Sequence, residues 1–559
     1  MPMSDYYDLG TYSRPVTTSS REAQLWFNRG LLWRYGFNNE EAVRCFRKAI
    51  EHDDRCAMAY WGVSYAYGPR YNKRWEDFEE QELLEALRHS RRSIEAALAR
   101  LDDAAPVEQA LIRALERRYQ SDRRVSNDEL RTWVDAYARS MREVYSAFPD
   151  DLDVSALFAE AMMNRTPWQL WDLETGEAAQ GADTLETVAV LERALQLIDE
   201  GGRAPNPGVL HMYIHTVEMS PHPERALRAC DALRDLAPDV GHLRHMPSHI
   251  DLLCGDYYAA LVANDRAIEA DRKYFEREGP INFYTLSRVH DLHFKVYAAM
   301  FLGQYGPALE AANELIATTP EALLRVTSPP MADWLEGFVA MKLHVLVRFG
   351  KWQEILDEPM PQDPVLYSVT TATLHYAKGV AHSACADIAA AEAEQQLFYE
   401  ALGGVQATRR IFSNTCTDIL AIAAAMLRGE IEYRKGNHEQ AFAHLRTAVE
   451  LDDNLPFNEP WGWMQPVRHA LGALLLEQDR VDEAIAVYRA DLGLDRTLSR
   501  VKRHPDNVWS LHGYVECLRR LGRHDELKSA QLRLDLAAAR ADARIAASCF
   551  CRVGHDCCG

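Results

Sequence analysis

Imidazole side chains are concentrated in one part of this sequence, between residues 207 and 294. The spacings there are HxxxHxxE, HxxHxxxH and HxxH. Residues three or four positions apart lie on one face of a helix, with Cβ atoms about 5–6 Å apart. Three successive segments therefore each offer a face that carries two or three potential metal ligands. These are His211, His215 and Glu218, then His242, His245 and His249, then His290 and His293.

Neutral imidazole suits zinc, copper, iron and nickel. One metal ion needs three or four protein ligands, so seven histidines indicate either two ions or ligands that are oriented by further histidines. Copper is the favoured ion, because the helical faces that carry the histidines supply many nitrogen donors and only one carboxylate, that of Glu218. A dinuclear centre would parallel, in ligand type alone, the copper proteins in which three histidines hold each ion.

Three other interpretations of the histidines stay open. Zinc is one, with Glu218 as the general base of a hydrolase. Iron is another, bound by two histidines and one carboxylate, which would be His211, His215 and Glu218. The third is a purely structural role, in which buried histidines hydrogen-bond to each other.

A second group of potential ligands lies at the C-terminus, where CxC is followed by HxCC. Thiolates select soft ions such as Cu(I) and zinc. This tail could close over the metal site, deliver copper or form a redox disulfide, or it could be an unstructured terminus. The candidate ligands are Cys549, Cys551, Cys557 and Cys558.

The elements that must position these residues are repeated helix pairs. Residues 23–56 read as helix, turn, helix, with small residues at Gly30, Ala42 and Ala49. This pattern resembles the tetratricopeptide repeat (TPR), a 34-residue helix pair with small residues at its positions 8, 20 and 27. Further copies begin near residues 207, 241 and 289, and no segment alternates as a strand would. We therefore expect an all-α chain.

The resemblance implies a right-handed superhelix, in which positions 2, 5, 9 and 12 of each repeat line a concave groove. All eight candidate ligands of residues 207–294 fall at these positions. The segments HMYIH at 211–215, HMPSHI at 245–250 and HDLHF at 290–294 also resemble a group of microbial TPR proteins that carry HMPSHI and HNxHF. This resemblance brings no established reaction with it.

The expected organisation is an N-terminal arm at 1–20, a continuous superhelix at 21–540 and the cysteine-rich tail at 541–559. Irregular segments at 166–183, 271–288 and 458–466 interrupt the repeats, and either wall a pocket or simply pack. Tyr284, in the second of them, could position a substrate or donate an electron or proton.

Composition limits the partners. The chain has 559 residues, with 62 Lys plus Arg against 83 Asp plus Glu and a net charge of −21. This argues against nucleic acid or an anionic membrane as partner. The N-terminus has no secretory signal, and no apolar run approaches the roughly 20 residues of a membrane span. We expect a cytoplasmic protein, with its oligomeric state open.

The function that we expect is a metal-dependent oxidoreductase acting on a small molecule or peptide in the groove, with Glu218 and Tyr284 as candidate catalytic residues. The alternatives are a TPR scaffold that binds a peptide or protein without catalysis, and a zinc-dependent hydrolase.

Overall fold

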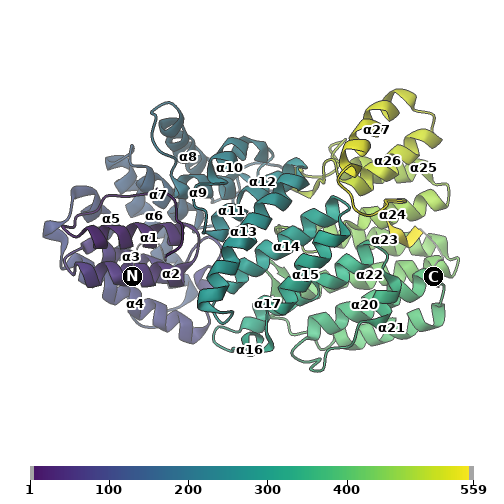
Figure 1. The fold of residues 1–559 in the computed structure, drawn as a ribbon, viewed down its shortest axis with the longest axis horizontal. Helices are drawn as coiled ribbons and strands as arrows, with labels where there is room; N and C mark the ends of the chain where they lie inside the picture. The colour runs from purple at the N-terminus through teal and green to yellow at the C-terminus, as the bar shows by residue number, and fades with distance from the viewer. Residues whose placement is uncertain (1–5, 553–559) are drawn as a thin grey trace. The chain divides into compact units, whose positions relative to one another are not determined.

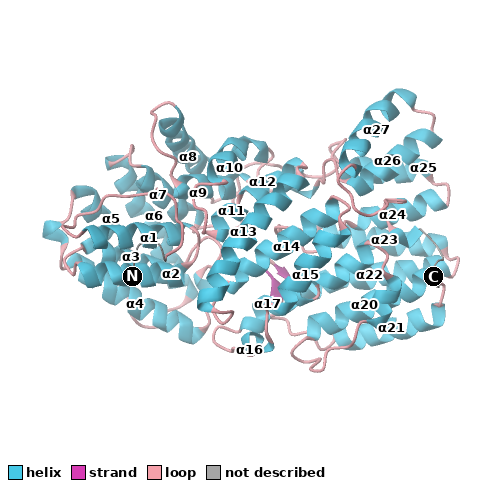
Figure 2. Cartoon of the chain, viewed as in Figure 1, coloured by secondary structure: helices cyan, strands magenta, loops and turns pink. Residues whose placement is uncertain are grey.

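The computed structural model describes residues 6–552, whose regular structure is almost entirely helical (Figures 1 and 2). Within this part of the chain, the strands are β1 (Arg410–Ile411) and β2 (Asn414–Thr415), which form one short hairpin. The all-α prediction is confirmed. No helix of the described part is long and apolar enough to cross a membrane.

The chain forms two compact units. Unit 1 consists of Met1–Ile250 and Arg266–Arg277, and unit 2 of Asp251–Asp265 and Glu278–Gly559. The helices of unit 1 are α1 (Arg21–Tyr35), α2 (Asn39–His52), α3 (Ala57–Tyr67), α4 (Glu80–Leu98), α5 (Pro106–Glu116), α6 (Asn127–Ala147), α7 (Leu152–Met163), α8 (Thr184–Asp199), α9 (Pro207–Val217), α10 (Leu227–Leu233) and α11 (Gly241–His245).

Helices α12 (Pro247–Cys254) and α13 (Tyr257–Glu278) contain residues of both units. Unit 2 continues with α14 (Thr285–Phe301), α15 (Tyr305–Ala317), α16 (Glu321–Leu324), α17 (Met331–Val339), α18 (Met341–Arg348), α19 (Trp352–Asp357), α20 (Ser368–Ala384), α21 (Ile388–Leu402), α22 (Cys416–Arg434), α23 (His438–Asp453), α24 (Val467–Glu477), α25 (Val481–Asp491), α26 (Val508–Arg520) and α27 (His524–Ala538).

Helices that follow one another in the chain pack together, as α1 does on α2, α20 on α21 and α22 on α23. Small residues allow this close approach, because Gly30 of α1 and Gly62 of α3 both lie against the ring of Phe46 in α2. Ala42 and Ala49 of α2 are fully buried. The helix-turn-helix architecture of TPR type is thus confirmed.

Gly62 gives a test of this packing. A Cβ at this position would lie 2.5 Å from the Phe46 ring, which is closer than real Cβ contacts. Because the ring is fully buried, it has little room to move. We expect Gly62→Val to lower the free energy of unfolding by about 1–3 kcal/mol, the usual cost of overpacking. Urea denaturation followed by circular dichroism measures this change, and an unaltered unfolding midpoint would contradict the packing described.

The irregular segment expected at 271–288 is partly helical, since α13 continues without a break to Glu278. The C-terminal tail is anchored up to residue 552 on unit 2. There the hydroxyls of Ser548 and Tyr488 lie 2.5 Å apart, and Arg348 donates to the Ser548 carbonyl at 2.6 Å. Within the described part of the tail, Ala547, Ser548 and Cys551 are therefore buried in unit 2.

Unit 2 also buries neutral histidines. Burial lowers the pKa of His344 and of His469 to about 4. In the unfolded chain the pKa of each is about 6.5. Between about pH 4 and 6.5 these two histidines thus bind more protons in the unfolded chain than in the folded one, and their contribution to stability falls as pH falls through this window.

His344 provides the pH test, because its ring packs edge-on against Trp463 with centroids 5.1 Å apart and burial alone shifts its pKa. Lowering the pH from 7 to 5 should destabilise the native chain more than the His344→Leu variant, by on the order of 1–2 kcal/mol. Paired urea denaturation curves at the two pH values measure this difference. If the difference in stability between the native chain and the variant is the same at both pH values, His344 does not titrate as described.

Candidate metal centre

Helix α9 holds the first two histidines of the centre in a fully buried position. It begins at Pro207, which lacks an N–H and so suits the first helical position, and the Asn206 side chain accepts a hydrogen bond from Val209 N. Every residue from Pro207 to Val217 is buried, so His211 and His215 face protein on all sides. Glu218 caps the C-terminus of α9 and is also fully buried.

The next three histidines come from two short helices. His242 and His245 lie on α11, and His249 lies on α12. Pro247 separates the two helices, since it has no N–H for a helical hydrogen bond. All three imidazoles are buried in unit 1. The predicted helical face of HxxHxxxH is therefore split in two, but it still brings its histidines to α9.

The ring nitrogens of these five histidines approach each other in two groups. His211, His215 and His242 each offer a ring nitrogen, and these atoms lie within 4.8 Å of one another. The Nε2 atoms of His211 and His242 are 3.2 Å apart, and those of His245 and His249 are 2.8 Å apart. Two nitrogens bound to one ion at about 2.0–2.1 Å lie roughly 2.9–3.4 Å apart. The His211–His242 distance falls in this range and the His245–His249 distance lies just below it, and both distances also suit hydrogen bonds between neutral imidazoles.

On three of these rings the other nitrogen, Nδ1, lies next to a hydrogen-bond acceptor. His211 Nδ1 lies 2.6 Å from the Tyr35 carbonyl oxygen. The two oxygens of Glu218 lie 2.9 Å from Nδ1 of His215 and of His249. A carbonyl and a carboxylate only accept hydrogen bonds, so each Nδ1 carries the proton and donates. The lone pair is then on Nε2, the tautomer that binds a metal in the carboxylate–histidine–metal arrangement.

Among these ring nitrogens, His215 Nε2 gives the strongest indication of a bound metal ion. Its ring is fully buried, and within residues 6–552 this nitrogen has no hydrogen-bond partner. Burial lowers the pKa of His215 well below its usual value, and burial lowers that of His211 to about 3. Both rings are therefore neutral at pH 7. A buried lone pair without a donor is costly, and a metal ion would satisfy it.

Aromatic side chains close the centre. The Phe37 ring lies 4.6, 6.0 and 5.2 Å from the rings of His211, His215 and His242. Tyr71 and Trp168 contact His215 at 5.0 and 5.7 Å. The histidines thus lie beneath these side chains and do not face an open groove.

Two of the aromatic residues have strained backbones. Phe37 and Trp168 have φ values of 58° and 60°, in the left-handed region that disfavours large side chains. Such strain costs on the order of 1–3 kcal/mol and is concentrated at functional sites. The sequence pattern indicated the segment of Trp168 but not Phe37, whose only local signal is the turn that follows it.

The other candidate residues lie in unit 2. His290 and His293 are on α14, where His293 Nε2 lies 2.9 Å from Met464 Sδ and the His290 ring lies 4.7 Å from that of Phe412. Tyr284 caps the N-terminus of α14 and is buried. Their roles as ligands and as a catalytic residue stay predictions.

The cysteine tail is described only in part. Cys549 and Cys551 form a disulfide, and in this state neither sulfur is a thiolate that could bind a metal. Cys557 and Cys558 lie outside the described residues. A metal-binding role of the tail stays a prediction.

Comparisons with known proteins add little to this geometry. No protein-family model and no curated protein matches the sequence. Among solved structures, the human IFIT1 dimer with m7Gppp-AAAA is 11% identical, with 94% of this chain and 92% of that chain covered and a TM-score of 0.32. Yeast Tom70 is 12% identical, with coverages of 93% and 98% and a TM-score of 0.30. Ypp1 is 9% identical, with coverages of 95% and 89% and a TM-score of 0.43.

At these identities and scores, the similarities carry no argument about what this chain binds or does. The fold and the site themselves define a helical-repeat protein with a buried cluster of histidines.

Proposed function

We propose that unit 1 binds a transition-metal ion on the Nε2 atoms of His211, His215 and His242, and that the protein is a metal-dependent oxidoreductase. The observation that carries this proposal is the buried Nε2 of His215, which has no partner among residues 6–552 although its Nδ1 is fixed by Glu218. Three imidazoles leave a coordination position open, as catalytic sites require. A second ion on His245 and His249 would make the centre dinuclear.

Copper is favoured over zinc and iron. Non-haem iron oxygenases use a carboxylate ligand, and zinc hydrolases commonly use a carboxylate as ligand or base. The carboxylate of this cluster is Glu218, and its two oxygens accept hydrogen bonds from His215 and His249. We therefore assign Glu218 the role of orienting the ligands. An all-nitrogen set holds copper in both of its common oxidation states, and the bound ion would supply one-electron chemistry with dioxygen.

The surrounding residues would control access to this chemistry. Phe37, Tyr71 and Trp168 cover the rings of the triad and keep bulk water away from the Nε2 atoms. A water-poor site strengthens every electrostatic interaction within it. Tyr35 contributes its carbonyl oxygen, which keeps the His211 ring in the tautomer that binds metal.

Reconstitution with single metals tests the reaction. Metal-free protein is loaded separately with copper, zinc or iron, and dioxygen consumption is followed with ascorbate as electron donor. We expect uptake with copper, at a rate well above that of the His215→Ala variant given the same amount of copper, which controls for loosely bound ion. Hydrolysis with zinc and no oxygen uptake with copper would contradict the oxidoreductase proposal. Inactivity with every metal, together with tight binding of a peptide, would leave the scaffold interpretation.

A further inference from the structure

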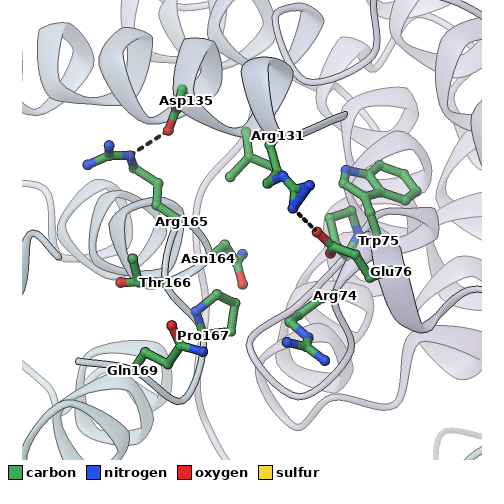
Figure 3. A pocket seen from close by; sticks show the side chains of 12 residues that line it. Arg74, Trp75, Glu76, Arg131, Asp135, Asn164, Arg165, Thr166, Pro167 and Gln169 are labelled. Atoms are coloured by element: carbon green, nitrogen blue, oxygen red, sulfur yellow. Dashed lines mark hydrogen bonds and ion pairs between the residues drawn. The ribbon is translucent and has the colours of Figure 1, made fainter. Parts of the chain in front are cut away.

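A second site in unit 1 lies outside the histidine cluster. It is a cavity of about 370 Å3 between the segment at residues 69–76, helix α6 and the residues that follow α7 (Figure 3). This volume lies within the range of about 300–1,000 Å3 that is usual for pockets that bind small molecules. Neither the metal centre nor its proposed chemistry uses the side chains that line it.

Three arginines stand around the cavity (Figure 3). Arg131 pairs with Asp128 at 2.7 Å and with Glu76 at 3.4 Å. Arg165 pairs with Asp135 at 2.7 Å and with Asp183, and Arg74 pairs with Asp77. With Glu76 and Asp135, the lining itself carries one positive charge in excess, while the further partners Asp77, Asp128 and Asp183 lie outside the lining. Each guanidinium has five N–H donors, and these pairs use only some of them.

Asn164 is the strongest indication of a ligand. Its side chain is 9% exposed, and neither its Oδ1 nor its Nδ2 has a hydrogen-bond partner within residues 6–552. Figure 3 shows this amide pointing into the space between the arginines. Thr166 Oγ1 and Trp75 Nε1, also on the lining, are buried and have no partner in the same part of the chain. In native proteins such groups are normally satisfied by protein, water or a ligand, and one bound polar molecule here would satisfy several of them.

We propose that this cavity binds a small anionic molecule through a carboxylate or phosphate group. The oxyanion would accept hydrogen bonds from the amide of Asn164 and from the arginines around it, which present the planar donor sets that such groups match. The ion pairs with Glu76 and Asp135 hold Arg131 and Arg165 in place before the anion arrives. The site does not require the proposed metal.

Calorimetric titration of the full chain tests this site, with inorganic phosphate and succinate as probes and sodium chloride at matched ionic strength as the blank. We expect saturable binding of one anion per chain by at least one of the two. Phosphate alone would identify a phosphate-bearing ligand, and succinate alone a carboxylate. Saturation by neither would overturn the proposal.

Two variants separate a built site from general charge attraction. Arg131→Gln should weaken binding at least tenfold, whereas Arg139→Gln, an equal charge change on an exposed residue of α6 that does not line the cavity, should leave it unchanged. Equal weakening by both would overturn the site.

Asn164→Ala should also weaken binding at least tenfold. Without ligand it should not lower the melting temperature, because no side chain in the described structure pairs with this amide. Undiminished binding by Asn164→Ala would contradict the proposal.

Discussion

Replacement of His215 by alanine should lower the affinity of the protein for a transition metal by on the order of 100-fold or more. Loss of a group that merely orients a ligand typically costs about 10- to 100-fold, and His215 would be a ligand itself. One of its ring nitrogens lies within 4.8 Å of potential ligand atoms of both His211 and His242. Competition titration against a chelator of known affinity gives the dissociation constants of the two proteins.

The matched control is His222→Ala. This histidine is also in unit 1 and is also paired with a glutamate, Glu224, but its side chain is 66% exposed. It should bind metal as the native chain does. The His215→Ala substitution leaves a cavity in the core, which destabilises the fold. The comparison of affinities is therefore made only if circular dichroism shows that the variant keeps the native helix content. Equal affinity of a folded His215→Ala variant would remove this residue from the site.

The second large effect is expected at Glu218. Glu218→Gln keeps the shape of the side chain but replaces one accepting oxygen by a donating NH2 group. Only one of the two Nδ1–H groups, that of His215 or that of His249, then still has an oxygen acceptor, so the other ring is free to turn or change tautomer. We expect metal affinity to fall by about 10- to 100-fold, while the ligands themselves are all still present.

This variant also separates two roles of the carboxylate. If Glu218 acts as the base of a zinc hydrolase, Glu218→Gln should abolish a zinc-dependent hydrolysis and leave metal affinity nearly unchanged. If Glu218 orients the imidazoles, Glu218→Gln should lower the affinity for the metal itself. The reconstituted variants, measured with zinc and with copper under the same conditions, distinguish these outcomes.

Local features of the chain were predictable from the sequence. The small residues Gly30, Ala42 and Ala49 indicate a helix pair, because only they allow two helices to approach so closely. The spacing of His211 and His215 places both on one helical face, since it equals about one helical turn. These inferences need only neighbours in the chain.

The partners of the histidines were not predictable in the same way. The acceptor of His211 Nδ1 is the carbonyl of Tyr35, 176 residues away, and no side-chain pattern marks a backbone oxygen. Phe37 covers three imidazoles from the turn after α1, which spacing alone does not reveal. For the same reason, the sequence suggested histidines that line a groove, whereas the structure buries them under aromatic residues that are distant in the chain.

The register along a helix is thus readable from the sequence, but the tautomers and the burial of the site depend on long-range contacts. Asn164 is a further example. Nothing in its sequence neighbourhood distinguishes an asparagine that only ends α7 with its backbone from one whose side-chain amide also faces a cavity.

The most direct test of the metal centre is the metal content of protein purified without a metal-affinity tag. Elemental analysis should find at least one transition-metal ion per chain in the native protein, and copper titration of metal-free protein should saturate at one or two ions. If the centre is dinuclear, the His245→Ala, His249→Ala double variant should lose the ion bound by those two histidines. The His211→Ala, His215→Ala double variant should lose the ion bound by the triad of His211, His215 and His242. Equal and substoichiometric metal in the native protein and in both folded double variants, before and after titration, would contradict the account.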